Sequence, residues 1–476
     1  MRPQPTLGRK DTSRRSFLGR LRLWFFVLST LTLAYLGWVK LEWLRPVGAL
    51  RDPLPAIGDA SIVRLDVFDS GSGLRSVEVA IEAEGTRFEI LNEEYPAASW
   101  RGSGVHQKSF DLPVSPRKAK MPQGEARLVV RARDHSWLNL FVTRPPVLEQ
   151  KIEIDYTPPT VEVLTGQHYM RLGGSEMVVY RPSADAVRSG VEVGKYFFPG
   201  TAGLLPDAAI QVALFAVPQD LGAGVQPKVI AVDRVGNRRE VSFWVSVKPR
   251  RFAERSLEID RGFLERKVPE ILNNNGLPPV DDLLEGYLQI NRDLRVKSEE
   301  KIHEVCARSV PEKLWDGVFQ RQPNSAPLSS FADRRTYTHA GKVIDHQTHL
   351  GFDLASLRLS EVPAANNGRV AFAGSLGIYG ETVILDHGLG LFSLYGHLSS
   401  VAVREGDTVK RGVTVGRTGE TGLAGGDHLH FSIMLWGIHV DPVEWWDPKW
   451  IEDHLTGKLA SFRSPQPAPP AAHVVS

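Results

Sequence analysis

The sequence predicts a mainly β protein with a compact antiparallel β-sheet domain at its C-terminal end. Two immunoglobulin-like β-sandwiches, a partly helical connector and an N-terminal transmembrane helix are expected to precede that domain. Three observations predict this fold class: an uncharged apolar run near the N terminus, two similar stretches of strand pattern, and short apolar runs separated by glycines near the C terminus. A chain of 476 residues, with 42% hydrophobic and 24% charged residues, is long enough for about three domains.

The N-terminal apolar run extends from Leu23 to Val39 and contains 17 residues without a charge. As a helix it would be about 26 Å long, which is just enough to cross the core of a bilayer. Residues 1–22 carry seven basic side chains against one acid, Asp11, and the positive-inside tendency places such a segment in the cytoplasm. We therefore expect a basic cytoplasmic segment at 1–22 and a transmembrane anchor at 23–39, in a single-pass protein of the inner (cytoplasmic) membrane.

Two other export signals compete with an uncleaved anchor. A cleaved signal peptide normally has a shorter apolar core that ends in small residues, whereas this one ends in Tyr35–Val39, which favours the anchor. Ser13–Leu18 resembles a twin-arginine signal, so export in the folded state stays open. The single cysteine, Cys306, excludes an internal disulfide, and outside the cell stability must come from packing.

Two stretches between the anchor and the C-terminal domain resemble each other. Val129–Asp134 in the first corresponds to Val229–Asp233 in the second, 100 residues later. A repeat of this length with strand patterning predicts two immunoglobulin-like sandwiches, at 52–156 and 157–250. The paired prolines in Tyr156–Thr160 indicate a stiff joint between them. Such modules are spacers or platforms that bind a partner, and their fold alone names no ligand.

Residues 251–325 form the expected connector, in which apolar side chains recur at helical spacing between many charges. These side chains are Leu257, Phe263, Leu264, Val268, Ile271 and Leu272, then Leu283, Leu284, Tyr287 and Leu288. Pro269 is expected to end or kink the first helix. Because the connector directly precedes the C-terminal domain, we hypothesise that it covers a cleft there and regulates access. The Pro- and Ala-rich tail at 464–476 is expected to be disordered.

The C-terminal domain is predicted at 326–450. Its predicted strands are 369–374, 382–385, 391–395 and 431–435. The glycines of Val401–Gly422 predict tight hairpins of an antiparallel sheet. They do not indicate a phosphate-binding loop, because the GxxxxGK[ST] pattern is absent from the sequence.

Histidines are concentrated in this domain. Eight of the 14 lie between positions 339 and 439, where His349 precedes Asp353 by four residues and His428 precedes His430 by two. Residues two apart on a strand face the same side at a spacing of about 6.8 Å, so His428 and His430 can line one cleft. Catalytic zinc takes three His, Asp or Glu ligands and leaves a fourth position for water. This clustering, with His397 between the two motifs, predicts a catalytic zinc site.

A histidine pair on a strand is by itself more often a packed or solvated pair than a set of metal ligands, and only the clustering favours a metal. Gly351 is expected to bend the chain so that His349 and Asp353 can meet. The remaining histidines of the cluster are predicted to be turn or rim residues. They are His339, His346, His387 and His439.

The two motifs resemble those of the lysostaphin-like (LytM-type) zinc endopeptidases, which cut the peptide part of bacterial peptidoglycan. The resemblance covers about residues 326–447. It implies that the Zn2+ ligands are His349, Asp353 and His430, that the catalytic pair is His397 and His428, and that Tyr337 is the nearest candidate for a transition-state stabiliser. All five ligand and catalytic positions are filled, which predicts an active enzyme.

The chemistry of such a site follows from charge. Zinc lowers the pKa of a bound water from near 16 toward about 7, so a hydroxide can attack an amide carbonyl that the same ion polarises. His397 and His428 are suited to accept the water's proton, to donate to the leaving amine or to hydrogen-bond the oxyanion. Their division of these roles is left open.

The sequence is therefore interpreted as a membrane-anchored metalloendopeptidase that hydrolyses peptide cross-links or stem peptides of peptidoglycan in the periplasm or outside the cell. A wall-synthesis or regulatory protein is the expected partner of the β-sandwiches. The net charge of +2 gives no reason to expect nucleic acid. The alternative is a non-catalytic LytM-type scaffold that activates a separate wall amidase, against which the complete residue set argues. An adhesion or morphogenesis scaffold could coexist with catalysis.

Overall fold

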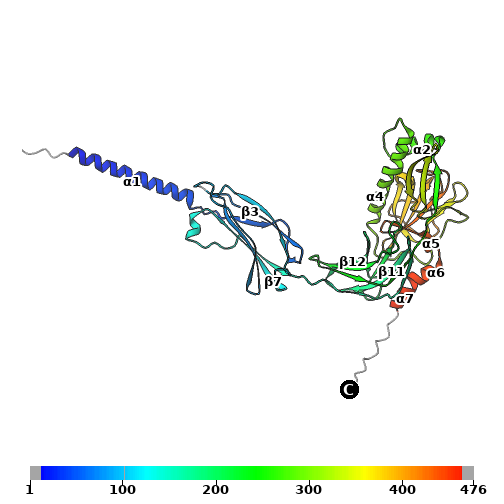
Figure 1. The fold of residues 1–476 in the computed structure, drawn as a ribbon, viewed down its shortest axis with the longest axis horizontal. Helices are drawn as coiled ribbons and strands as arrows, with labels where there is room; N and C mark the ends of the chain where they lie inside the picture. The colour runs from blue at the N-terminus through cyan, green and yellow to red at the C-terminus, as the bar shows by residue number, and fades with distance from the viewer. Residues whose placement is uncertain (1–11, 101, 464–476) are drawn as a thin grey trace, which may run out of the picture. The chain divides into compact units, whose positions relative to one another are not determined.

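Strands outnumber helices in the computed structural model, which describes residues 12–100 and 102–463 (Figure 1). The mainly β fold class is confirmed. The predicted tail at 464–476 and the first half of the predicted cytoplasmic segment, up to residue 11, lie outside the described residues. The chain divides into two compact units, one of residues 1–157 with 234–237 and one of residues 158–233 with 238–476.

The first unit combines one long helix with two sheets. It contains α1 (Thr12–Lys40), β1 (Val47–Leu50), β2 (Ala56–Ile57), β3 (Ser61–Phe68), β4 (Leu74–Ala83), β5 (Thr86–Glu94), β6 (Gln107–Val114), β7 (Gly124–Asp134), the 3-10 helix η1 (Trp137–Leu140) and β8 (Leu148–Ile154). The sheets have the orders β1-β3-β6 and β2-β8-β7-β4-β5, and the alternating apolar residues of β3, β4 and β7 form one core between them. Within α1, Gly19–Lys40 is long and apolar enough to cross a membrane.

The second unit begins with two four-stranded sheets. Its first strands are β9 (Val161–Val163), β10 (His168–Arg171), β11 (Ser175–Pro182), β12 (Ala186–Val193), β13 (Tyr196–Pro199), β14 (Thr201–Ala202), β15 (Gln211–Ala216), β16 (Lys228–Asp233), β17 (Arg238–Ser242) and β18 (Val245–Lys248). The sheet orders are β14-β15-β11-β9 and β13-β12-β16-β17, and β10 pairs with β18. The similar segments of the predicted repeat lie on β7 and β16. The immunoglobulin-like topology and the domain boundaries stay predictions.

The connector is a strand followed by helices. It contains β19 (Glu254–Glu258), α2 (Arg261–Asn274), α3 (Leu283–Gln289), the π-helix η2 (Ile290–Leu294) and α4 (Arg295–Cys306). The helical prediction was wrong for Leu257, which lies on β19 and pairs with Tyr337 across a parallel ladder. Pro269 does not end α2, which continues to Asn274. Asp260 caps α2 by accepting a hydrogen bond from Phe263 N.

The C-terminal part is built on one large antiparallel sheet. Its elements are β20 (Ala326–Ser329), β21 (Arg334–His339), β22 (Lys342–Thr348), β23 (Phe352–Ala355), β24 (Glu361–Pro363), β25 (Gly368–Ser375), η3 (Gly377–Tyr379), β26 (Glu381–Gly388), β27 (Leu391–Leu398), β28 (Ser400–Val401), β29 (Thr408–Val409), β30 (Thr414–Arg417), β31 (Leu429–Leu435), β32 (Ile438–Val440), α5 (Pro442–Trp445), α6 (Pro448–Ile451), η4 (Glu452–Thr456) and α7 (Gly457–Arg463). The main sheet has the order β20-β23-β31-β27-β26-β25-β29. The four strands predicted here are confirmed as parts of β25, β26, β27 and β31.

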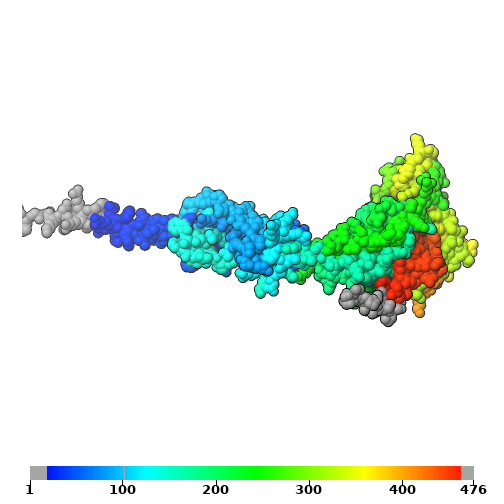
Figure 2. Space-filling model, turned by 60° about the horizontal axis from the view of Figure 1, so that its bottom comes forward, coloured from blue at the N-terminus to red at the C-terminus, as the bar shows by residue number. Residues whose placement is uncertain are grey.

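Two apolar cores hold the second unit together. One joins the strands that begin this unit to the main sheet and to α5, with Trp445 fully buried, and the C-terminal helices (red) lie against those strands in Figure 2. The other packs the connector helices on the main sheet through side chains such as Ile302, Ile384 and Phe392. Asp353 and His430 of the predicted metal site lie on the main sheet, and His349 lies in the segment just before β23.

Candidate metal centre

Strand register brings the predicted ligands together. β23 pairs with β31 so that Asp353 lies opposite His430, and β31 pairs with β27 so that His430 lies opposite Gly396. His349 lies in the segment between β22 and β23, and His397 follows Gly396 on β27. Three adjacent strands therefore deliver residues that are up to 81 positions apart in the sequence.

The three predicted ligand atoms form a tight triangle. His349 Nε2 lies 3.0 Å from Asp353 Oδ1 and 3.1 Å from His430 Nδ1, and His430 Nδ1 lies 2.9 Å from Asp353 Oδ1. Such edges fit one face of a tetrahedral ion whose bonds are about 2.0–2.1 Å long. Within the described residues this is the one group of three His, Cys, Asp or Glu side chains close enough to hold a metal.

Hydrogen bonds fix which nitrogen of each ligand histidine faces this triangle. His349 Nδ1 donates to the carbonyl of Ser330 at 2.9 Å, which leaves Nε2 with its lone pair toward the site. Ser432 Oγ donates to Leu350 O and accepts from His430 Nε2 at 3.2 Å, which leaves Nδ1 of His430 toward the site. Two lone pairs and a carboxylate oxygen therefore converge, and a bound cation satisfies all three at once.

Gly351 allows this approach because a side chain there would fill the site. A Cβ atom at this position would lie 2.3 Å from His430 Nε2 and 2.6 Å from Ser432 Oγ. The predicted bend is present. Its backbone, however, does not occupy the left-handed region, so Gly351 is required by the close approach of His430 rather than by conformational freedom.

The predicted catalytic histidines also present one nitrogen each to the cavity. His397 Nδ1 donates to Thr421 O and His428 Nδ1 donates to Gly426 O, both at 2.8 Å, and the two rings lie 5.0 Å apart. His397 has a φ of 61°, a conformation that costs energy in a residue other than glycine and that occurs often at functional sites.

The pKa values of the two histidines shift in opposite directions. Burial and the nearby charges of His428 and His430 hold the pKa of His397 well below its usual value. Burial also lowers the pKa of His428, but the hydrogen bond and charge of Asp353 outweigh it and raise that pKa. His397 is therefore neutral near pH 7 and able to accept a proton.

Arg335 on β21 contacts the ligand carboxylate from its other side. Its guanidinium donates to Asp353 Oδ2 at 3.1 Å, which leaves Oδ1 for the triangle. Burial opposes ionisation of Asp353, but the charge and hydrogen bonds of the surrounding histidines outweigh it, and its pKa lies well below the usual range.

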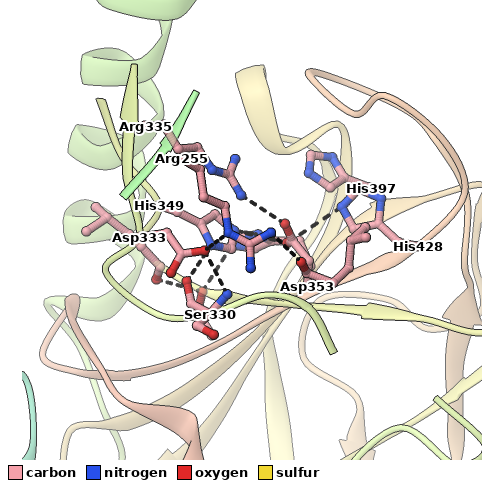
Figure 3. Close-up of polar contacts among 12 residues, drawn as sticks. Arg255, Ser330, Asp333, Arg335, His349, Asp353, His397 and His428 are labelled. Carbon is pink, nitrogen blue, oxygen red and sulfur yellow. Dashed lines mark hydrogen bonds and ion pairs between the residues drawn. The ribbon is translucent and has the colours of Figure 1, made fainter. Parts of the chain in front are cut away.

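A second arginine reaches the site from the connector (Figure 3). Arg255 on β19 lies opposite Arg335 in the parallel ladder and forms an ion pair of 3.0 Å with the buried Asp333. Asp333 accepts a hydrogen bond from Ser330 N, and its backbone carbonyl accepts one from His349 N. The connector is therefore linked through Asp333 and Ser330 to the orientation of His349. This link could not be predicted from the sequence, because it depends on strand pairing between distant segments.

A cavity of about 370 Å3 opens beside these side chains. It is lined by all five predicted ligand and catalytic residues, by Tyr337 and by connector residues that include Arg255, Phe263 and Tyr287. Tyr337 is buried, and its ring packs edge-on against Tyr287 at 6.1 Å. The connector thus forms one wall of the cavity, which agrees with its hypothesised position and leaves its regulatory role a hypothesis.

Two histidines predicted to lie at turns or at the rim are buried instead. His387 is fully buried, bonded to Asn367 O and Ser393 Oγ, and burial lowers its pKa to about 4. His439 contacts Glu299 of α4 at 3.1 Å. His387 lies on β26, which continues to Gly388, and the segment after α4 covers the turn through hydrogen bonds from Leu314 N to His387 O and from Leu389 N to Val310 O.

Comparison with known proteins identifies the family of this part of the chain. Residues 347–442 match the model of peptidase family M23. The DD-carboxypeptidase/endopeptidase Mpg of Neisseria meningitidis serogroup B is 38% identical over 95 residues, which cover 20% of this chain and 22% of that protein. The peptidoglycan DD-endopeptidase ShyA of Vibrio cholerae is 30% identical over 130 residues, covering 27% of this chain and 30% of ShyA.

Another similar protein is named as a lipoprotein and not as a peptidase. The lipoprotein NlpD/LppB homologue of Pseudomonas aeruginosa is 42% identical over 98 residues, which cover 20% of this chain and 32% of that protein. The chain spans less than a third of the length of each of these curated relatives.

Proposed function

Residues 347–442 form an M23 peptidase domain, and we propose that the chain is a zinc-dependent endopeptidase which hydrolyses peptide cross-links or stem peptides of bacterial peptidoglycan during cell-wall remodelling. The observation that carries the proposal is the completeness of the site. Three ligand atoms converge, and two further histidines present a nitrogen each to the same cavity. A domain that does not catalyse hydrolysis would not need both the three metal ligands and the two further histidines.

The ligands of the proposed zinc ion are His349, Asp353 and His430. A bound zinc ion supplies a Lewis acid and makes a hydroxide available near neutral pH. The neutral His397 accepts a proton at Nε2, because its Nδ1 is already donating to Thr421 O. His428 Nε2 lies 3.6 Å from Asp353 Oδ1, and its raised pKa suits it to donate a proton or a hydrogen bond. Tyr337 lines the cavity and is proposed to hydrogen-bond the oxyanion.

The decisive experiment compares two histidine variants and one tyrosine variant of the full-length chain in detergent, with purified peptidoglycan as substrate. His430→Ala should lose both bound zinc and the release of new amine ends. His397→Ala should lose activity and keep zinc, because it supplies no ligand. Tyr337→Phe should lower kcat roughly 10²-fold with zinc retained.

His346→Ala is the matched control, because His346 lies exposed on β22 and its side chain hydrogen-bonds Thr336 rather than a residue of the site. It should retain zinc and activity. A fully active His430→Ala protein with unchanged zinc content would contradict the proposed function. For the active protein, the masses of the released fragments identify the bond that is cut.

The similarity to NlpD-type proteins, one of which is named a murein hydrolase activator, supports a second candidate function. In this alternative the domain recruits and activates a separate wall amidase and cuts no bond itself. Zinc binding without hydrolysis, together with stimulation of an added amidase that survives His397→Ala, would favour the activator over the peptidase.

We also propose a location. The apolar span of α1 is assigned to the inner membrane with the N terminus in the cytoplasm, so the M23 domain faces the periplasm or the cell exterior, where peptidoglycan lies. The strands between α1 and the connector are proposed as a spacer or as a platform for a wall-synthesis or regulatory protein. Protease protection of the N terminus in inverted vesicles would contradict this orientation.

A further inference from the structure

An exposed apolar loop lies next to the end of α1. Residues 137–143, of sequence WLNLFVT, carry no charge and include the helix η1. Their large side chains face solvent, with exposed fractions of 45% for Trp137, 70% for Leu140, 78% for Phe141 and 50% for Val142. Isolated exposed apolar residues are common on soluble domains, but four within six positions make a patch that usually marks an interaction surface.

Specific contacts hold this loop against the residues at which α1 ends. Ser136, which caps η1, lies with its Oγ 3.2 Å from the carbonyl of Lys40, the last residue of α1, and accepts a hydrogen bond from Glu42 N at 3.1 Å. At the other end of the loop, Arg144 donates to Glu42 O at 2.9 Å. The guanidinium of Arg144 is fixed in turn by an ion pair of 3.0 Å with the fully buried Asp134. The loop therefore stays beside the end of α1.

The residues around this junction have the character of a membrane interface. Trp38 and Trp43 are 87% and 82% exposed on either side of Lys40, and Leu44 is also exposed. Arg45 follows them on the surface. Tryptophan with nearby basic side chains is enriched where a membrane-spanning helix leaves the hydrocarbon core, because the ring suits the headgroup region and the cation suits lipid phosphate.

We propose that the η1 loop and the end of α1 form one membrane-contacting surface, in which Leu140 and Phe141 insert into the outer face of the bilayer that α1 spans. The inference rests on the proposed membrane location of α1 and is independent of the peptidase activity. The surface contacts lipid, because the apolar span of α1 ends at Lys40 and Ser136 lies within hydrogen-bond distance of that residue. The unit is thereby held to the membrane at two points, the helix and the loop.

The test uses the full-length chain in phospholipid nanodiscs with single labelled cysteines. The native Cys306 is buried, so an introduced exposed cysteine reacts selectively. Phe141→Cys reports on the loop. Ile62→Cys is the matched control, because Ile62 is also exposed, at 46%. It lies near one end of β3, whereas Phe68 at the other end pairs with Val47, the first residue of β1. That separation is roughly 20 Å along the strand. Leu31→Cys reports on α1.

Each cysteine carries an environment-sensitive fluorophore, and the lipids carry a quencher either near the headgroup or in mid-chain. The label at 141 should emit at shorter wavelength than the label at 62 and be quenched several-fold more strongly by the headgroup quencher. The label at 31 should be quenched most by the mid-chain quencher.

Three outcomes overturn the proposal. If the label at 141 is as accessible to water as the label at 62 while that at 31 is in lipid, the loop does not contact the membrane. A blue-shifted label at 141 without lipid quenching assigns the surface to a protein, either a partner or a second copy. An unquenched label at 31 removes the premise that α1 lies in the membrane, whether or not the chain hydrolyses peptidoglycan.

Discussion

Arg334 and Arg335 are neighbours on β21, but only one of them contacts the metal centre. Successive residues of a strand face opposite sides, and accordingly Arg335 donates to Asp353 Oδ2 whereas Arg334 donates to Thr348 Oγ1. Partners that orient a ligand typically contribute 10–100-fold to metal affinity. We expect Arg335→Gln to weaken zinc binding by about that factor, and a competition titration with a chelator measures it.

Arg334→Gln is the control for this prediction, since it removes a guanidinium from the same strand without touching a ligand. Its zinc affinity should equal that of the unchanged chain. Equal losses in both variants would mean that β21 itself is disturbed, and no loss in Arg335→Gln would mean that Asp353 needs no partner at Oδ2.

Gly351 gives a second prediction at the scale of one residue. A methyl group there would lie 2.3 Å from His430 Nε2, so Gly351→Ala must displace a ligand. We expect zinc affinity to fall roughly 10–100-fold. Gly166→Ala is the comparison, because a Cβ at Gly166 meets nothing within 4 Å. Unaltered zinc binding by Gly351→Ala would show that β23 and β31 can move apart without cost.

At this scale the sequence predicted a set of residues that the structure brings together around one cavity, but hardly any of the side chains that support them. The predicted ligands and His428 stand in two motifs with short spacings, which a single sequence displays, and His397 lies between them. Ser330, Asp333 and Arg335 act only through partners fixed by the fold, and their own spacing carries no signal. His387 was missed as a core residue because burial of a polar ring depends on acceptors, here Asn367 O, that come from another strand end.

Among the elements, α4 couples the connector to the ligand region through one carboxylate. Glu299 accepts from Tyr379 Oη at 2.6 Å and contacts His439 Nε2 at 3.1 Å, and the ring of Tyr379 packs 5.2 Å from that of His430. Burial opposes ionisation of Glu299, but the charge and hydrogen bond of His439 and the hydrogen bond of Tyr379 outweigh it and lower its pKa to about 2.

The lowered pKa of Glu299 leads us to predict how the free energy of unfolding depends on pH. The native state holds its proton more weakly than the unfolded chain, so this stabilisation is fully present above the ordinary pKa of 4.5 and is lost as the pH falls toward about 2. Glu299→Gln should therefore lower the free energy of unfolding at pH 7 by roughly 1–3 kcal/mol and reduce its decline in acid. Denaturant titrations at several pH values measure both effects.

Glu300→Gln is the adjacent control, because Glu300 is exposed on the same helix. It should change neither the stability nor its acid dependence. If Glu299→Gln behaves in the same way, the contact between α4 and Tyr379 contributes nothing measurable to the fold.

Element prediction succeeded where periodicity is strong and failed where pairing is distant. The strands of the main sheet were visible as apolar runs between glycines. In the connector, helical spacing was correct for α2 and α3 but included Leu257, whose strand conformation is imposed by its parallel pairing with β21, 80 positions later. Pro269 lies within α2 because packing of Val268, Ile271 and Leu272 in the core offsets one missing hydrogen bond.

At the scale of the second unit, one continuous core joins its first strands to the M23 domain, although the repeat pattern suggested separate modules. Glu444 of α5 lies at this junction, where its Oε2 accepts from Ser175 N at 2.8 Å and from Ser175 Oγ at 3.1 Å. Glu176 beside it is paired with His454 and Lys458. The junction therefore contains the fully buried Glu176 and the half-buried Glu444, of which only Glu176 has cationic partners in the described residues.

Burial raises the pKa of Glu444 to about 8, so the native state keeps a proton that the unfolded chain releases near the ordinary pKa of 4.5. Unfolding thus releases a proton between these values, and this group makes stability fall as the pH rises from about 4.5 to 8, by at most about 1.4 kcal/mol for each pH unit. Glu444→Gln removes the titration, so its unfolding midpoint should decline less than that of the unchanged chain between pH 5 and 8. The exposed Glu452→Gln on η4 should keep the original slope. Parallel slopes for Glu444→Gln and the unchanged chain would mean that Glu444 is ionised in the native state and that the donors on Ser175 outweigh its burial.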